Sequence, residues 1–104
     1  GEFGNVVQAE GTHIVADADL TGGGVNRKVS IVAVDKVIQG EKSKTVLLRR
    51  VAVGTIVEVG SRTIKITCSD AAETITKGMK VLSATVPPSV TFADSRIKDI
   101  DSGL

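Results

Sequence analysis

The side chains that could do chemistry gather at one point of the sequence. Asp17 and Asp19 lie two residues apart, and Thr21 and three glycines follow them in the stretch ADADLTGGG. Alternating oxygen donors before a glycine are typical of a calcium loop, whose twelfth position supplies a bidentate glutamate. Counted from Asp17, that position is Lys28, whose ammonium group repels a cation. A regular calcium loop is therefore excluded, and Asp17 and Asp19 remain candidates for a weak, irregular cation site.

Phosphoryl chemistry is a second interpretation of the same residues. The stretch IVADADLT, residues 14–21, resembles the D-x-D-x-T signature of haloacid-dehalogenase-type phosphohydrolases. The resemblance implies that Asp17 is a nucleophile and Asp19 a general acid, with Mg²⁺ between them. It also implies a doubly wound fold in which the motif ends a parallel strand. The chain downstream lacks the alternating helices of that fold, so we do not expect this activity.

The glycine run could also suggest a phosphate loop. Such loops direct backbone N–H groups at the anion from the N-terminus of a helix. Here a strand-like segment follows the glycines, and no Gly-Lys-Ser/Thr motif occurs. We therefore predict that residues 20–26 form a mobile, glycine-rich connection between strands.

Other catalytic arrangements are not indicated. His13 is the only histidine, so a multi-histidine metal centre is excluded, and no G-x-S-x-G motif is present. Cys68 is the only cysteine and lies in an alternating apolar pattern, which predicts a small core residue instead of a reactive thiol. We expect no enzyme activity, no catalytic or metal-binding centre and no cofactor.

The distribution of apolar residues predicts an all-β fold. Only two aromatic residues occur, so the core must come from valine, isoleucine, leucine and alanine, and β-branched side chains favour strands. Residues 28–38 are apolar on both faces, which predicts a strand that is buried on both sides or lies in a barrel wall. Ile64, Ile66 and Cys68 alternate with polar residues, as in a strand with one face in water. The predicted strands are residues 28–38, 45–53, 55–59, 63–68 and 79–86.

The connections predict how these strands pair. The short polar segments QGEKSK and GSR predict two hairpins, and Gly54 predicts a bend or bulge. Asp70 and Glu73 form a weak capping box, which predicts one helical turn. The expected architecture is a small antiparallel β-barrel or β-sandwich of five to seven strands. A C-terminal tail, residues 87–104, is expected to form a short helix or to stay extended.

The basic residues indicate one further class of function. Residues 41–65 carry six basic and two acidic side chains, a net charge of +4, whereas the whole chain carries +1. If the basic side chains met on one face of an SH3-like or OB-like barrel, they could contact phosphates of a nucleic acid. The segment has no aromatic side chains for base stacking, which weakens this alternative. The candidate contact residues are Lys42, Lys44, Arg49, Arg50, Arg62 and Lys65.

Taken together, the sequence favours a non-enzymatic structural or protein-interaction module that assembles with copies of itself or with a larger partner. Its composition is similar to that of small β-domains of phage and virus particles, although no motif supports this impression. No run of about 20 apolar residues is present, so no membrane span is expected. Residues 1–4 are expected to be a cloning remnant, and residues 5–104 a single domain. The sequence gives no indication of the cell compartment.

Overall fold

The computed structural model of the chain describes residues 3–17, 24–41, 43–83 and 88–93. These residues contain seven strands and no helix, and all strand pairs are antiparallel. The prediction of an all-β, antiparallel fold is therefore confirmed. The strands are β1 (Phe3–Glu10), β2 (His13–Asp17), β3 (Lys28–Gln39), β4 (Lys44–Val59), β5 (Thr63–Ala71), β6 (Lys80–Leu82) and β7 (Ser89–Ala93).

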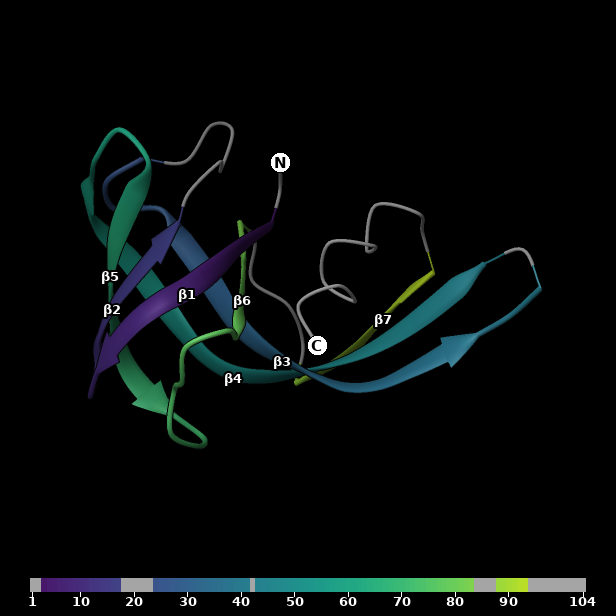
Figure 1. The fold of residues 1–104 in the computed structure, drawn as a ribbon. Helices are drawn as coiled ribbons and strands as arrows, with labels where there is room; N and C mark the ends of the chain where they lie inside the picture. The colour runs from purple at the N-terminus through teal and green to yellow at the C-terminus, as the bar shows by residue number, and fades with distance from the viewer. Residues whose placement is uncertain (1–2, 18–23, 42, 84–87, 94–104) are drawn as a thin grey trace.

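Six of the strands form a closed ring. Their order is β3-β6-β1-β2-β5-β4, and β4 pairs with β3 to close the sheet. The result is a barrel, seen in the left half of Figure 1, and not a pair of stacked sheets. Within the described residues, closure gives each ring strand a neighbour on both sides over part of its length, which limits the open edges that promote uncontrolled association.

The barrel interior is filled by aliphatic side chains. Alternate residues of each ring strand point inward, and the polar residues between them point to solvent. Cys68 is buried among them, as expected from the sequence. With no large aromatic group in this cluster, many branched side chains of similar size fill the space. The cluster includes Val6, Ile14, Val29, Ile31, Ile56, Ile64, Ile66 and Val81.

A second apolar cluster lies on the opposite face of β3 and β4. Val32, Val46, Leu48 and Leu82 are buried there, and Val34 and Val37 pack against them. Val29 and Ile31 of the same strand point into the barrel. The prediction that residues 28–38 are buried on both faces is thus confirmed for the first half of β3.

Strands β3 and β4 continue beyond the barrel as an arm. We define the arm as residues 34–39, 44–49 and 89–93; it is a three-stranded sheet with β4 between β3 and β7. Figure 1 shows it projecting to the right of the barrel. Two β-bulges mark the junction, because Val51 is an extra residue in β4 and Asp35 an extra residue in β3. Bulges bend a strand and increase its twist, which explains why the arm leaves the barrel wall.

The hairpins were predicted correctly in most respects. β3 pairs with β4, and β4 with β5, but the two runs predicted at 45–53 and 55–59 form one continuous strand. Gly54 lies inside it and is paired with Cys68; the bend or bulge predicted there corresponds to a register shift whose extra residue is Ser69 of β5. Gly11, at a φ of 61°, occupies the first central position of the β1–β2 hairpin, as a type II′ turn requires.

One local prediction is wrong. Residues 70–73 do not form a helical turn, because β5 extends to Ala71 and Asp70 pairs with Val53 of β4. The Glu73 carboxylate, expected to cap that turn, instead accepts hydrogen bonds from Arg49. Strand pairing of Asp70 and the ion pair of Glu73 are thus formed in place of the helical turn that the weak capping pattern predicted.

Several predicted segments fall partly outside the described residues. Of the connection at 20–26, only the turn Gly24–Arg27 is described, closed by a hydrogen bond from Arg27 N to Gly24 O. Of the strand at 79–86, residues 80–82 are observed. In the C-terminal tail, β7 is extended and paired, while residues 94–104 lie outside the described part. Phe3 and Gly4 belong to β1, and the cloning origin of residues 1–4 stays a prediction.

Candidate functional site

The most organised polar feature on the barrel surface is a row of five side chains. Each one lies directly opposite the next on the neighbouring strand, so the row crosses five strands from β3 to β1. At least one chain neighbour of each member packs in the barrel core, which places the row on the outer face; these neighbours are Val29, Ile56, Ile66, Ile14 and Ala9. The row consists of Lys28, Thr55, Thr67, His13 and Glu10.

Two adjoining depressions follow this row, and we call them together the transverse groove. One has a volume of about 420 Å³ and includes Glu10, His13 and Thr67. The other has a volume of about 360 Å³ and includes Lys28, Thr55 and Thr67. Both are lined by Thr67 and by Val57, an exposed residue at a register shift of β4, so the two depressions adjoin at these residues.

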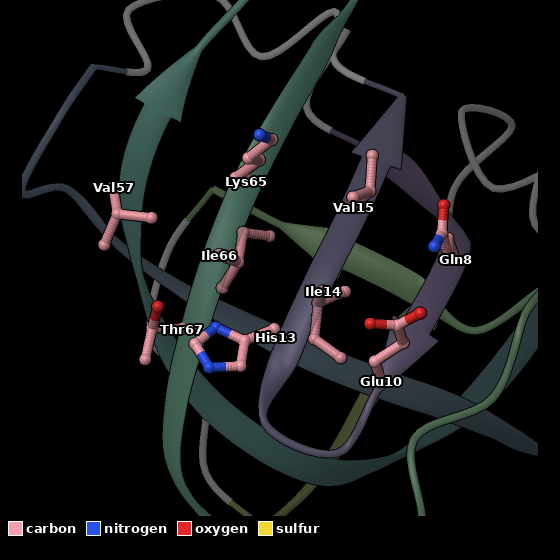
Figure 2. Close-up of a pocket in the computed structure, with 9 residues that line it drawn as sticks. All are labelled: Gln8, Glu10, His13, Ile14, Val15, Val57, Lys65, Ile66 and Thr67. Carbon is pink, nitrogen blue, oxygen red and sulfur yellow. The ribbon is translucent and has the colours of Figure 1, made fainter.

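The floor of the groove is made by small hydroxyl side chains, and its sides are partly apolar. Figure 2 shows the first depression, with Val15 and Lys65 on one side of His13 and Thr67. Val57 flanks the same depression on β4 (Figure 2). A surface that mixes methyl groups with a few polar groups is typical of a binding site and also of a solvated sheet face.

The charges of the groove are separated along its length. At the β3 end, the Lys28 ammonium donates a hydrogen bond of 3.0 Å to the Thr55 hydroxyl, a neutral group. At the β1 end, Glu10 is exposed and forms no ion pair with any described residue. Lys65 in the wall is compensated by Glu58, at 2.9 Å. The net effect is a positive end and a negative end.

His13 lies between a hydroxyl and a carboxylate, an order that resembles a catalytic relay. Its register neighbours are Thr67 on β5 and Glu10 on β1. In Figure 2, however, the imidazole lies beside Thr67 while the Glu10 side chain points to the other side of β2. No hydrogen bond joins His13 to either of these described residues, whereas a relay requires both. The described geometry at His13 is therefore not that of a catalytic relay, and the expectation that the chain is not an enzyme stays a prediction.

A second polar cluster holds the junction of barrel and arm. The Arg49 guanidinium donates to both oxygens of Glu73, at 2.7 and 2.8 Å, and also to Asp35. Asp35 is the extra residue of the β3 bulge, and Glu73 follows β5. One planar cation therefore ties the bulge to the barrel, as bidentate arginine–carboxylate pairs commonly do.

This ion pair predicts a pH dependence of stability. Hydrogen bonds from Arg49 lower the pKa of Glu73 and raise the pKa of Arg49. A carboxyl group whose pKa is lower in the folded state stabilises that state above its unfolded pKa, about 4.3, and the effect is lost as pH falls through the folded pKa. Urea unfolding at about pH 6 and about pH 3 should therefore show a larger loss of stability for the wild type than for Glu73→Gln. Equal losses would contradict a stabilising role of the pair.

The predicted basic contact residues are not gathered on one surface. Lys44 begins β4 at the arm, and Arg62 lies in the turn at the opposite end of that strand. Arg49 is bound to carboxylates at the junction, and Lys65 pairs with Glu58 in the groove wall. Arg50 lies in β4 next to the bulge, and Lys42 is outside the described residues. Within the described part, the spacing along a 16-residue strand keeps these charges apart.

Of the two aspartates proposed for a weak cation site, only Asp17 is described. It ends β2, and its carboxylate accepts hydrogen bonds from Asn5: 2.6 Å from the backbone N–H and 3.4 Å from the side-chain amide. The Asn5 side-chain oxygen in turn accepts a hydrogen bond of 2.6 Å from buried Lys80. Asp19 lies outside the described residues. No cluster of three or more potential metal ligands occurs in the described ranges.

The arm provides the third surface feature, an open strand edge. Residues 34–39 of β3 pair with β4 on one side, and no strand of the described chain pairs with them on the other. Ile38 is 51% exposed at this edge. Unpaired N–H and C=O groups beside an exposed apolar residue form a template for another strand.

Comparisons with protein-family models, curated proteins and solved structures find no match for this chain. None of the described segments is a helix of the length and apolarity needed to span a membrane. The functional interpretation therefore depends on the groove, the junction and the arm themselves.

The members of the groove row were not predicted as site residues. Alternation alone places Thr67 on the outer face of its strand. Whether Thr67 lies opposite His13 depends on the register of β5 against β2, two strands separated by about 50 positions in the chain. A local sequence pattern does not indicate how two strands so far apart in the chain align with each other.

Proposed function

We propose that this chain is a non-enzymatic assembly module that joins copies of itself by adding strands to the edge of its arm. The observation that carries the proposal is that β3 continues past the closed barrel to Gln39 with a partner on one side only. Among the described ring strands, the one-sided stretch of β3 in the arm, residues 34–39, is longer than that of β1, residues 7–10, so strand pairing is directed mainly to the arm. Pairing of strand edges is a common mode of protein recognition.

The pattern of backbone hydrogen bonds between β3 and β4 in the arm supports strand addition at this edge. Gly40 N donates to Ser43 O at 2.8 Å, so this pair at the end of the hairpin is a hydrogen-bonded one. In antiparallel sheets hydrogen-bonded and non-bonded pairs alternate. Counted from the Gly40/Ser43 pair, the pairs Val37/Val46 and Gln39/Lys44 are therefore not hydrogen-bonded to each other. The backbone N–H and C=O groups of Val37 and Gln39 point away from β4, toward the open side.

The substitution Gln39→Pro tests the proposal with little disturbance of the arm. Proline removes the outward N–H of Gln39 but none of the bonds to β4, and the replaced side chain is exposed. We expect the wild type to associate as its concentration rises, and the variant to need a concentration about fivefold higher, because each contact loses hydrogen bonding worth roughly 1 kcal/mol in total. Sedimentation velocity measures both.

Val25→Pro is the matched control. Val25 precedes Asn26, whose φ is 74°, in the turn Gly24–Arg27, and this geometry accepts proline at Val25. Its association should equal that of the wild type, and circular dichroism should show that all three proteins are folded. A strictly monomeric wild type at about 1 mM, a concentration at which very weak contacts form, would overturn the proposal. Equal association of Gln39→Pro and the wild type would exclude the β3 edge.

A further inference from the structure

The free edge of β3 in the arm carries a pattern of backbone groups that defines which strand can add to it. Val37 and Gln39 direct their N–H and C=O groups away from β4, while Ile38 between them directs its own toward Thr45. In an antiparallel sheet the two residues of a hydrogen-bonded pair exchange both of their bonds. A strand that adds to this edge must therefore present two outward residues separated by one inward residue.

The same edge of a second copy of this chain meets that requirement when the two β3 strands run antiparallel. Val37 of each copy then lies opposite Gln39 of the other, so the outward groups of both residues are bonded. A shift by one residue would oppose outward groups with inward ones. A shift by two residues would place Gln39 opposite Asp35, the extra residue of the bulge, or Val37 opposite Glu41, which lies beyond the end of β3. One register of the pair is therefore favoured.

In this register the Ile38 side chains of the two copies face each other at a twofold axis. They form a non-hydrogen-bonded pair of the new contact, and in such pairs the side chains approach most closely. Ile38 is 51% exposed, so contact with its copy removes apolar surface from water. Lys36, two residues away on the same face, lies opposite Gly40 of the other copy. The aliphatic part of Lys36 can therefore cover the Ile38 pair while its ammonium stays in water.

We propose that two copies of this chain form a symmetric dimer in which their β3 edges pair about a twofold axis at Ile38. This inference rests on the proposed function and gives its geometry, since the two arms join into one continuous sheet of order β7-β4-β3-β3-β4-β7. The same residues make the contact on both copies, so the contact closes on itself. Strand addition at this edge therefore stops at two copies.

Ile38→Cys tests the position of the axis, because cysteines in a non-hydrogen-bonded antiparallel pair lie within disulfide distance. Mild oxidation should convert this variant to a covalent dimer, measured by non-reducing electrophoresis. Val57→Cys is the matched control, since Val57 is similarly exposed, at 49%, but lies on the barrel. Lys36→Cys, on the same face as Ile38, reports a shifted register. Both should cross-link at least about fivefold more slowly, and the wild type should not cross-link, because Cys68 is buried.

Charged substitutions at position 38 test the symmetry without a covalent bond. Ile38→Glu and Ile38→Lys should each associate about two- to fivefold more weakly than the wild type, because like charges then lie opposite each other. An equimolar mixture of the two variants should associate more strongly than either variant alone, since opposite charges face each other in the mixed dimer. Sedimentation velocity measures all three. Mixing Val57→Glu with Val57→Lys should have no such effect.

The possible results separate this inference from the proposed function. If the wild type associates but Ile38→Cys cross-links no faster than Val57→Cys, the symmetric dimer is wrong, while strand addition in another arrangement remains. Faster cross-linking of Lys36→Cys than of Ile38→Cys would contradict the register. A wild type that stays monomeric would overturn the proposed function and this inference together.

Discussion

Gly54→Ala is expected to destabilise the barrel by about 2–3 kcal/mol, because there is no room for a methyl group in the wall. A Cβ atom at this position would lie 2.4 Å from Ile66 Cγ2, 3.0 Å from Cys68 Sγ and 3.2 Å from the backbone oxygen of Thr67. Ile66 and Cys68 are buried in the barrel core, so neither can move away freely. Strand β4 would have to separate locally from β5, at the register shift next to Gly54.

Gly24→Ala is the matched control for this experiment. Its Cβ would meet no atom within 4 Å, and its φ lies outside the range that disfavours side chains. Its effect should stay within about 0.5 kcal/mol. Urea unfolding gives the free energies for both variants. Similar values for Gly54→Ala and Gly24→Ala would show that the packing around Gly54 is looser than the structure indicates.

Leu48→Ala is expected to cost about 2–5 kcal/mol, through a cavity in the second apolar cluster. Leu48 is fully buried there together with Val32, Val46 and Leu82. This cluster is on the opposite face of the sheet from the barrel interior, so the result measures how much the outer packing of β3 and β4 contributes to stability. The unfolding free energy from a denaturant titration is the quantity to compare.

Leu47→Ala provides the same chemical change one residue away. Leu47 is half-buried on the opposite face of β4 and belongs to neither buried cluster. The removed atoms were already partly in water, so we expect less than half the loss found for Leu48→Ala. If the two losses were equal, the assignment of faces in the arm would be wrong.

The parts of the fold that the sequence predicts are those with regular local patterns. Residues 28–38 are apolar on both faces and are buried on both faces in the first half of β3. The alternation of residues 63–68 reproduces the burial of β5. The glycine at position 54 predicted a bend or bulge, because glycine suits both, and only the pairing with β5 shows that the extra residue is Ser69 on the neighbouring strand.

Strands β1 and β7 were not predicted, for two different reasons. Val7 is an extra residue opposite β2 and is exposed, so a bulge interrupts the apolar alternation of β1. β7 is short, and its strand structure depends on pairing with β4, which lies about 40 residues earlier in the chain. Neither a bulge nor a distant partner leaves a recognisable local period.

The candidate functional surfaces could not be predicted for the same reason, since they depend on residues that are distant in the sequence. Arg49 was proposed as a contact residue for a partner or a phosphate, but its carboxylate partners at positions 35 and 73, which come from distant parts of the chain, were not predicted. The groove residues belong to five strands and meet only through the register of the closed sheet. Their chemistry was visible in the sequence, while their arrangement was not.

The two bulges have a consequence for how this protein can change during evolution. Val51 and Asp35 are each extra to the pairing, and the cross-strand pairs on both sides of them keep a regular antiparallel ladder. Deleting one of these residues would leave the faces of the neighbouring strand residues unchanged, whereas a deletion elsewhere in β3 or β4 would turn every later side chain to the other face. Gain or loss of one residue at exposed position 35 can therefore alter the angle of the arm while the barrel wall, and the groove on it, stay as they are, whereas loss of buried Val51 would also leave a cavity in the core.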